Sequence, residues 1–191
     1  MQRLEFYCYD SELWVKMADG SNKIVDENCT ELISFILNKV RECYPEAYKA
    51  LEECYRKSSR NIKYYQFLMA RRFVKCNFSQ LDSTKLDVSD INQDGRFNFE
   101  KVSCPIRGEC QHECVICMPK FNSKLSPAEM RVMEPFYRGW SKEKIAEYLY
   151  LSPGTVALHI KNSYIKLGIH EKAEFIRYVN DNNLFDNAQE L

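Results

Sequence analysis

The chain contains three helix start signals in succession, in SPAEMRVMEPFYRGW (residues 126–140), SKEKIAEYLYL (141–151) and SPGTVALHIKNSYIKLG (152–168). Each piece begins with serine, which is favoured immediately before a helix because its hydroxyl accepts a backbone N–H. In the first and third pieces a proline follows, at a position where its missing N–H has no helical partner to lose. In the first piece, Glu129 stands three residues after Ser126, which predicts a capping box. The pattern therefore predicts three consecutive helices.

The spacing of apolar residues predicts that the second and third helices are short and joined by a tight turn. These residues recur at intervals of three or four: Ile145, Tyr148, Leu149, Val156, Ile160, Tyr164 and Leu167. Gly139 and Gly168 follow the first and third helices, where a residue that tolerates positive φ commonly ends a helix. Two helices joined in this way form a helix-turn-helix.

Residues 122–185 resemble the LuxR-type, or GerE-type, helix-turn-helix of bacterial transcription factors. The matching residues occur in order: Leu125-Ser126, Glu129, Val132, Gly139, Ser141, Ile145-Ala146-Glu147, Leu149, Leu151-Ser152, Gly154-Thr155-Val156, His159, Asn162, Lys166-Leu167-Gly168 and Ala173-Glu174. The resemblance implies a sequence-specific transcriptional regulator with a four-helix DNA-binding domain, whose third helix (residues 152–167) enters the major groove of double-stranded DNA. It also implies a homodimer paired through a fourth helix, residues 171–180.

Seven residues of the third helix and its cap are our candidates for DNA contact. Five are expected to face the groove and two to lie near phosphates: Thr155, Ala157, Leu158, Lys161 and Asn162, and then Ser152 and Lys166. The helix contains no acidic residue, as expected for a surface that meets phosphates. However, Ala157 and Leu158 replace a lysine and a small or polar residue that the family usually carries. The alternative is therefore a protein-interaction module that docks on RNA polymerase or another regulator and binds DNA weakly.

The rest of the chain predicts an α+β protein. In residues 1–103, short aromatic and β-branched runs at 4–9, 13–17 and 23–25 predict a small antiparallel sheet, and three amphipathic helices follow at about 29–43, 45–55 and 61–73. Asn28 or Thr30 is the expected cap of the first helix. The predicted organisation is an N-terminal α/β sensor or interaction module (1–103), a Cys-rich hinge (104–121) and the all-α four-helix LuxR-type domain (122–191).

Composition excludes several classes of protein. The 191 residues include equal numbers of acidic and basic side chains and only three histidines. The chain shows no nucleophile elbow and no glycine-rich phosphate loop, so we do not expect an enzyme. No apolar run reaches the length of about eighteen residues that a membrane span needs. Nine cysteines, an odd number, without a secretory leader favour a reducing cytoplasm over a disulfide framework.

Four cysteines lie within fourteen residues in CPIRGECQHECVIC, residues 104–117. Because short loops are easily closed, Cys104, Cys110, Cys114 and Cys117 could bind one metal centre. Structural zinc is the first candidate, since a C-x-x-C pair is a common zinc knuckle. An iron–sulfur cluster and free thiols are the alternatives. A metal or redox state here could control the adjacent DNA-binding helices. His112 is a possible substitute ligand, although an exposed turn residue is the simpler interpretation.

Two further patterns have ordinary interpretations that we prefer. Residues 90–100 partly match a calcium-binding loop, but the closing acid occupies the eleventh place, so a β-hairpin turn returning to the N-terminal sheet is the better prediction. A basic run could contact phosphates, but solvated surface charge is the more common meaning of such a run. The run consists of Arg56, Lys57, Arg60, Lys63, Arg71, Arg72 and Lys75.

Overall fold

The computed structural model describes residues 3–78, 89–93, 95–182 and 184–185. The chain divides into two compact units, Met1–Lys120 and Phe121–Leu191. Together they contain a small antiparallel sheet and seven α-helices in the described residues, which confirms the α+β class. None of the described helices combines the length and apolar character that a membrane span needs.

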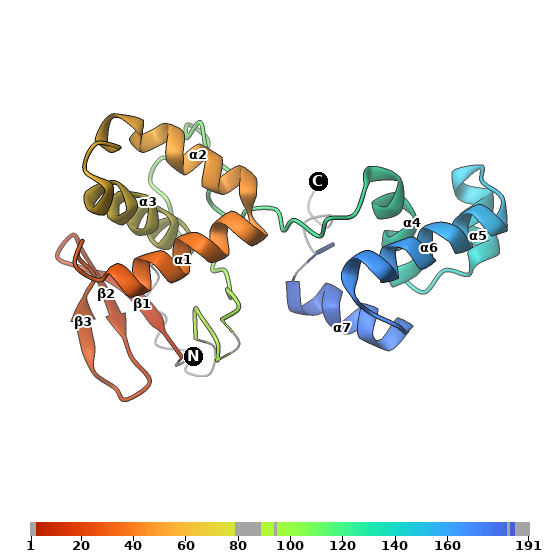
Figure 1. Cartoon of the computed structure of the whole chain (residues 1–191), viewed down its shortest axis with the longest axis horizontal. Helices are drawn as coiled ribbons and strands as arrows, with labels where there is room; N and C mark the ends of the chain where they lie inside the picture. The colour runs from red at the N-terminus through yellow and green to blue at the C-terminus, as the bar shows by residue number, and fades with distance from the viewer. Residues whose placement is uncertain (1–2, 79–88, 94, 183, 186–191) are drawn as a thin grey trace. The chain divides into compact units, whose positions relative to one another are not determined.

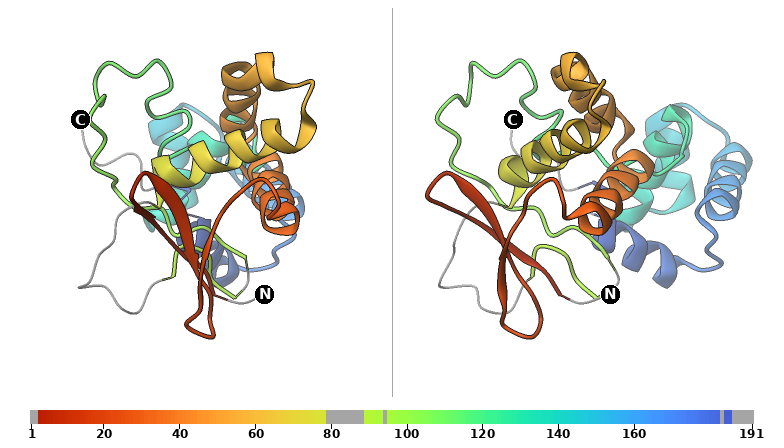
Figure 2. Two further views of the ribbon diagram at one scale, coloured as in Figure 1. Left: turned by 90° about the vertical axis from the view of Figure 1, so that its left-hand side faces the viewer. Right: turned by 60° about the vertical axis from the view of Figure 1, so that its left-hand side comes forward.

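The N-terminal unit begins with a three-stranded sheet in the order β1 (Glu5–Tyr9), β2 (Glu12–Lys16) and β3 (Asn22–Ile24). Phe6 pairs with Val15 across the β1–β2 ladder, and both side chains are buried. Side chains of successive strand residues point to opposite faces, so this pairing places the apolar residues on one face of the sheet. Helices α1 (Thr30–Cys43), α2 (Pro45–Tyr55) and α3 (Ile62–Asn77) lie together along one side of that sheet (Figures 1 and 2).

Two details of these helices differ from the prediction. The residue that precedes α1 is Cys29, without a side-chain cap, so the expected capping by Asn28 or Thr30 is wrong. The carboxylate of Asp26 organises this turn instead, by accepting the backbone N–H of Asn28 at 2.9 Å. Helix α3 also continues four residues beyond the predicted end at Phe73.

Residues 89–99 return to the sheet and complete the core of this unit. Leu4 and Ile91 exchange two backbone hydrogen bonds of 3.0 and 3.1 Å, and Ile91 also forms a bridge with Phe97. This contact confirms the predicted return to the sheet, although it consists of isolated bridges, and Asp94 lies outside the described residues. The buried Asp90 accepts the N–H of Phe6 at 2.5 Å, so this carboxyl supports the fold.

An aromatic cluster fills the space that this return closes. Its rings come from α3, from the segment after it and from the end of α1: Tyr44, Phe73, Phe78, Phe97 and Phe99. Ring centroids lie 5.2–6.1 Å apart in these pairs, within the usual range for interacting aromatic side chains. The core of this unit therefore joins segments that are far apart in the sequence.

The C-terminal unit consists of α4 (Pro127–Tyr137), α5 (Lys142–Leu149), α6 (Pro153–Leu167) and α7 (Lys172–Asn182). All four helices agree with the predicted ones to within two residues at each end. Their inner faces form one hydrophobic core of buried residues: Val132, Met133, Ile145, Ala146, Val156, Ile160, Phe175, Val179 and Phe185. This single core is what orients α6.

Candidate nucleic-acid interface

The first helix of the C-terminal unit begins with the predicted capping box. The hydroxyl of Ser126 accepts the backbone N–H of Glu129 at 3.3 Å, and Glu129 Oε2 accepts the N–H of Ser126 at 2.7 Å. Two N–H groups that would lack helical partners are thereby satisfied. Gly139, with φ of +87°, follows the helix where the sequence predicted its end.

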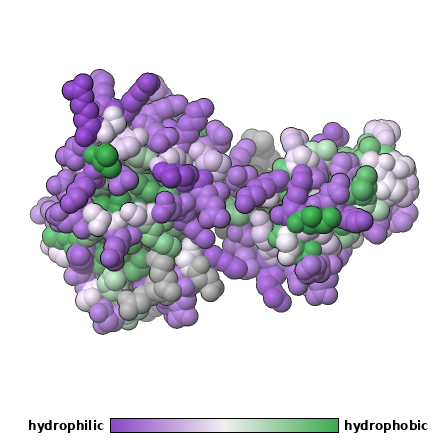
Figure 3. All heavy atoms as spheres, in the orientation of Figure 1, coloured by the Kyte–Doolittle hydropathy of each residue, from purple (hydrophilic) through white to green (hydrophobic). Residues whose placement is uncertain are grey.

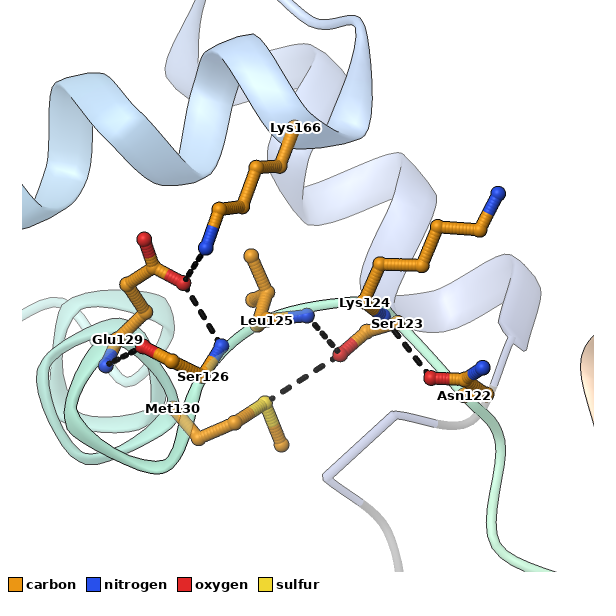
Figure 4. Close-up of polar contacts among 8 residues, drawn as sticks. All are labelled: Asn122, Ser123, Lys124, Leu125, Ser126, Glu129, Met130 and Lys166. Carbon is orange, nitrogen blue, oxygen red and sulfur yellow. Dashed lines mark hydrogen bonds and ion pairs between the residues drawn. The ribbon is translucent and has the colours of Figure 1, made fainter.

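The same glutamate ties α4 to α6. Lys166, near the end of α6, donates from Nζ to Glu129 Oε2 at 2.7 Å, so one oxygen receives both the lysine and the backbone N–H of Ser126 (Figure 4). The hydrogen bond from Lys166 is the main reason that the pKa of Glu129 lies below its ordinary value, and the Ser126 N–H adds to the effect. This contact fixes the C-terminal end of α6 against the start of α4.

The turn between α5 and α6 has the geometry of a helix-turn-helix. Ser141 caps α5 by accepting the N–H of Lys144 at 3.2 Å, and the helix ends at Tyr150 in the left-handed region, with φ of +55°. The N–H of Leu151 then donates to the carbonyl of Ala146 at 2.9 Å. Ser152 starts α6 by accepting the N–H of Thr155 at 3.0 Å. Three residues therefore separate the two helices, in agreement with the predicted turn.

Helix α6 has a buried face and an exposed face. Val156, Ile160 and Ser163 point into the core of the unit. On the opposite side, Lys161 and Asn162 are exposed. The exposed side also includes apolar residues, because Leu158 is 56% and Ile165 is 70% exposed. The outer surface therefore places the polar Lys161 and Asn162 beside two aliphatic side chains, Leu158 and Ile165.

The seven candidate DNA-contacting residues fall into three groups. Leu158, Lys161 and Asn162 are exposed on the outer face of α6, and Thr155 and Ala157 are half-buried beside it. Ser152 uses its hydroxyl in the helix cap, within 2.9 Å of the Thr155 hydroxyl. Lys166 is engaged by Glu129. The assignment of all seven to DNA contact stays a prediction.

Sequence reasoning missed two features of this surface. Ile165 follows Leu158 by seven positions and Lys161 by four, so helical periodicity alone could have placed it on the exposed face. The pairing of Lys166 with Glu129 had no comparable signal, because 37 residues separate the two.

The four predicted metal-ligating cysteines lie in one segment, but the structure does not group their side chains around a common metal position. Cys104 and Cys114 are exposed, whereas Cys110 and Cys117 are half-buried. Among the residues that the structure describes, no three His, Cys, Asp or Glu side chains are grouped so as to hold a metal ion. The Nε2 atom of His112 lies 3.1 Å from the sulfur of Cys54 on α2. The metal ligand set of the sequence analysis therefore stays a prediction.

Two residues of the basic run, for which solvated surface charge is the preferred interpretation, have a structural role. Arg71 and Lys75 each donate to the carbonyl of Ser11 at 3.0 Å, from α3 to the turn between β1 and β2. Asp10 and Ser11 both have positive φ in that turn, with values of 50° and 65°. These two cations therefore support a strained turn, which favours the ordinary interpretation of the basic run.

Comparison with known proteins finds matches in the C-terminal unit. The family described as bacterial regulatory proteins, luxR family, matches residues 123–179. Over 60 residues, the chain is 38% identical to the Fimbriae Z protein of Salmonella typhimurium (strain LT2), an alignment that covers 31% of this chain and 29% of that protein. No solved structure gives a significant match. The capped helices, the three-residue turn and this family match agree, and residues 123–179 are a helix-turn-helix domain of the luxR family.

Proposed function

We propose that this chain is a transcriptional regulator that binds double-stranded DNA sequence-specifically by placing α6 in the major groove. The observation that carries the proposal is the exposed face of α6, where Lys161 and Asn162 project from a helix without acidic residues. A lysine can contact a phosphate or a guanine edge, and an asparagine can pair with adenine through two hydrogen bonds. The luxR family match at residues 123–179 supports the same assignment.

We expect the regulator to bind a two-fold DNA site as a homodimer, as symmetric helix-turn-helix proteins commonly do. Helix α7 is the candidate dimer contact. Phe175 and Val179 on α7 are buried in the core of their own unit, whereas Ile176 is 37% exposed. Only the exposed side of α7 is therefore available to a second copy, and Ile176 would be central to it.

The test is a pair of lysine substitutions that remove the same charge from different units. Lys161→Ala should weaken binding to the operator by about 1–3 kcal/mol if Lys161 reads a base. If Lys161 contacts a phosphate, the main effect should be a decrease of about one in the slope of log affinity against log salt. Lys49→Ala, on the exposed face of α2, is the control and should leave both quantities unchanged.

The operator is first located by footprinting DNA upstream of the gene for this chain with the full-length protein. Affinity is then measured by electrophoretic mobility shift over a range of salt concentrations. Unchanged binding by Lys161→Ala at every salt concentration would remove Lys161 from the interface. Failure of the unaltered chain to bind any DNA more tightly than random sequence would overturn the proposed function.

A second function, docking on RNA polymerase or another regulator, is favoured by a specific observation. Apolar side chains are exposed on α5, on the turn and on α6: Tyr148, Tyr150, Leu158 and Ile165. Figure 3 shows apolar areas among the hydrophilic surface of this unit. Exposed apolar side chains are more typical of a protein contact than of a phosphate contact. Co-purification with RNA polymerase, without a specific shift of any upstream DNA, would select this second function.

Control by a metal or redox state at the cysteine cluster belongs to the same proposal. It requires cysteines that can share one metal centre, and the predicted set of four is not gathered at one point. A change in operator affinity between the metal-loaded and the metal-free chain would support this control.

A further inference from the structure

A cavity of about 350 Å³ lies in the N-terminal unit, between α3 and residues 102–117. Four cysteines line it, one from α3 and three from the later segment: Cys76, Cys104, Cys110 and Cys117. Cys114 is not among the described residues that line the cavity. The cavity therefore includes a cysteine that lies outside the sequence cluster and omits one that belongs to the cluster.

Asn77 explains why α3 and the cysteine segment lie together. Its amide Nδ2 donates to the carbonyls of Phe73 and Ile116 at 2.8 and 2.9 Å, and its Oδ1 accepts the N–H of Met118 at 2.8 Å. Asn77 is fully buried, so these bonds are shielded from water. Because Asn77 follows Cys76 and binds both neighbours of Cys117, it joins the two segments that carry these cysteines.

Cys114 contributes its backbone to this arrangement. Its φ is +57°, in the left-handed region that favours glycine, and its side chain is exposed. Its backbone N–H donates to the sulfur of Cys117 at 3.3 Å. A hydrogen bond to sulfur stabilises a thiolate, so the N–H of Cys114 supports Cys117 as a metal ligand.

We propose that Cys76, Cys104, Cys110 and Cys117 are the ligands of an iron–sulfur cluster in this cavity, and that Cys114 is not a ligand. Each thiol would release its proton as its sulfur binds iron. A single zinc ion needs its ligands at about 2.3 Å from one point, whereas these four cysteines lie around a cavity of about 350 Å³. A four-iron cluster instead binds four thiolates at separate iron atoms, which suits cysteines spaced around a cavity.

The remaining lining residues fit a cluster of net negative charge. Val102, Pro105, Ile106 and Ile116 make much of the wall apolar. Arg72, Lys75 and Arg107 also line the cavity, against one acidic residue, Glu113. Glu113 itself accepts the N–H of Gly108 at 2.6 Å, which shapes the loop between Cys104 and Cys110. An apolar wall with excess positive charge stabilises a buried anionic centre.

The experiment compares two cysteine substitutions in the full-length chain, purified from cells without exposure to oxygen. The unaltered chain should contain about four iron and four sulfide ions and absorb visible light. Cys76→Ala should keep less than about one tenth of that iron, because even supporting residues of metal sites change affinity by at least tenfold. Cys114→Gly should keep all of it, since glycine suits the positive φ at this position. Circular dichroism of each variant reports whether the chain is folded.

Several results would overturn the proposal: loss of iron from Cys114→Gly, full retention by a folded Cys76→Ala, or one zinc ion and no iron in the unaltered chain. If Cys76→Ala does not fold, Cys110→Ala and Cys114→Gly still give opposite expectations for iron content. All readouts are made without DNA. The result is therefore independent of whether α6 binds an operator.

Discussion

Asp90 in the N-terminal unit and Glu129 in the C-terminal unit are buried to the same degree, with 3% and 4% exposure, yet their pKa values shift in opposite directions. Burial is the main cause that raises the pKa of Asp90 to about 8, against one backbone N–H from Phe6. The pKa of Glu129 is lowered, mainly because Lys166 donates to it. Burial alone favours the neutral acid, and a cation in contact reverses that preference.

The two units also differ in the contacts that stabilise each of them internally. In the C-terminal unit, each helix carries its own start signal, and Glu129 joins two elements through a charged contact. In the N-terminal unit, the aromatic cluster and Asp90 join segments that the sequence keeps far apart. We therefore expect substitutions to act within one unit and to respond differently to pH.

The largest expected effect is that of Phe175→Ala, which removes a fully buried ring from the core of the C-terminal unit. Truncation of a buried phenylalanine costs about 3–5 kcal/mol, because a cavity replaces its contacts. Hydrogen exchange followed by mass spectrometry of peptides from the full chain should show faster exchange in residues 121–182 alone. Glu147→Ala, on the exposed side of α5, is the control and should change stability by less than about 0.5 kcal/mol. Equal acceleration in both units would refute their independence.

Glu129→Ala should have the next largest effect. It removes the acceptor of the Ser126 N–H and the partner of Lys166, and loss of such a cap costs about 0.5–2 kcal/mol. Because the folded pKa of Glu129 is lowered, its stabilisation is complete above the ordinary value of 4.5 and is lost as the pH falls through the folded pKa. Denaturant unfolding of the unaltered chain and of Glu129→Ala, from pH 7 to pH 3, measures this loss. The free energies of unfolding of the two proteins should converge in acid. Lys166→Met should cost less, because the lysine is partly exposed.

The smallest expected effect, in acid below pH 3.8, is that of Asp90→Asn, which keeps an oxygen for the Phe6 N–H and should there change stability by less than about 1 kcal/mol. Its pH dependence should be opposite to that of Glu129. The folded pKa of about 8 exceeds the ordinary 3.8, so the contribution of Asp90 is full below pH 3.8 and declines as the pH rises to 8. The asparagine variant should lack this decline in urea unfolding of the N-terminal unit. A parallel decline in both proteins would assign the pH dependence to another group.

The C-terminal domain could be predicted almost completely from the sequence, because its signals are local. Ser126, Ser141 and Ser152 each cap a helix as expected, and Gly139 and Gly168 follow helices in the left-handed region. Each of these signals acts over about four residues, so the contact that it makes does not depend on the rest of the fold. The exposed positions of Lys161 and Asn162 follow from helical periodicity once the helix is placed.

Only the tertiary structure decided which distant groups meet. Lys166 pairs with Glu129, and Asp90 returns to Phe6, although at least 37 positions separate the residues of each pair. Cys76 reaches the cysteine segment in a similar way, because Asn77 beside it binds Ile116, 39 positions away. Residue spacing carries no information about such contacts, since chain closure over these distances depends on the packing of the whole unit. The sequence by itself determined the helices and their exposed faces, and packing determined the charge partners and which cysteines share a cavity.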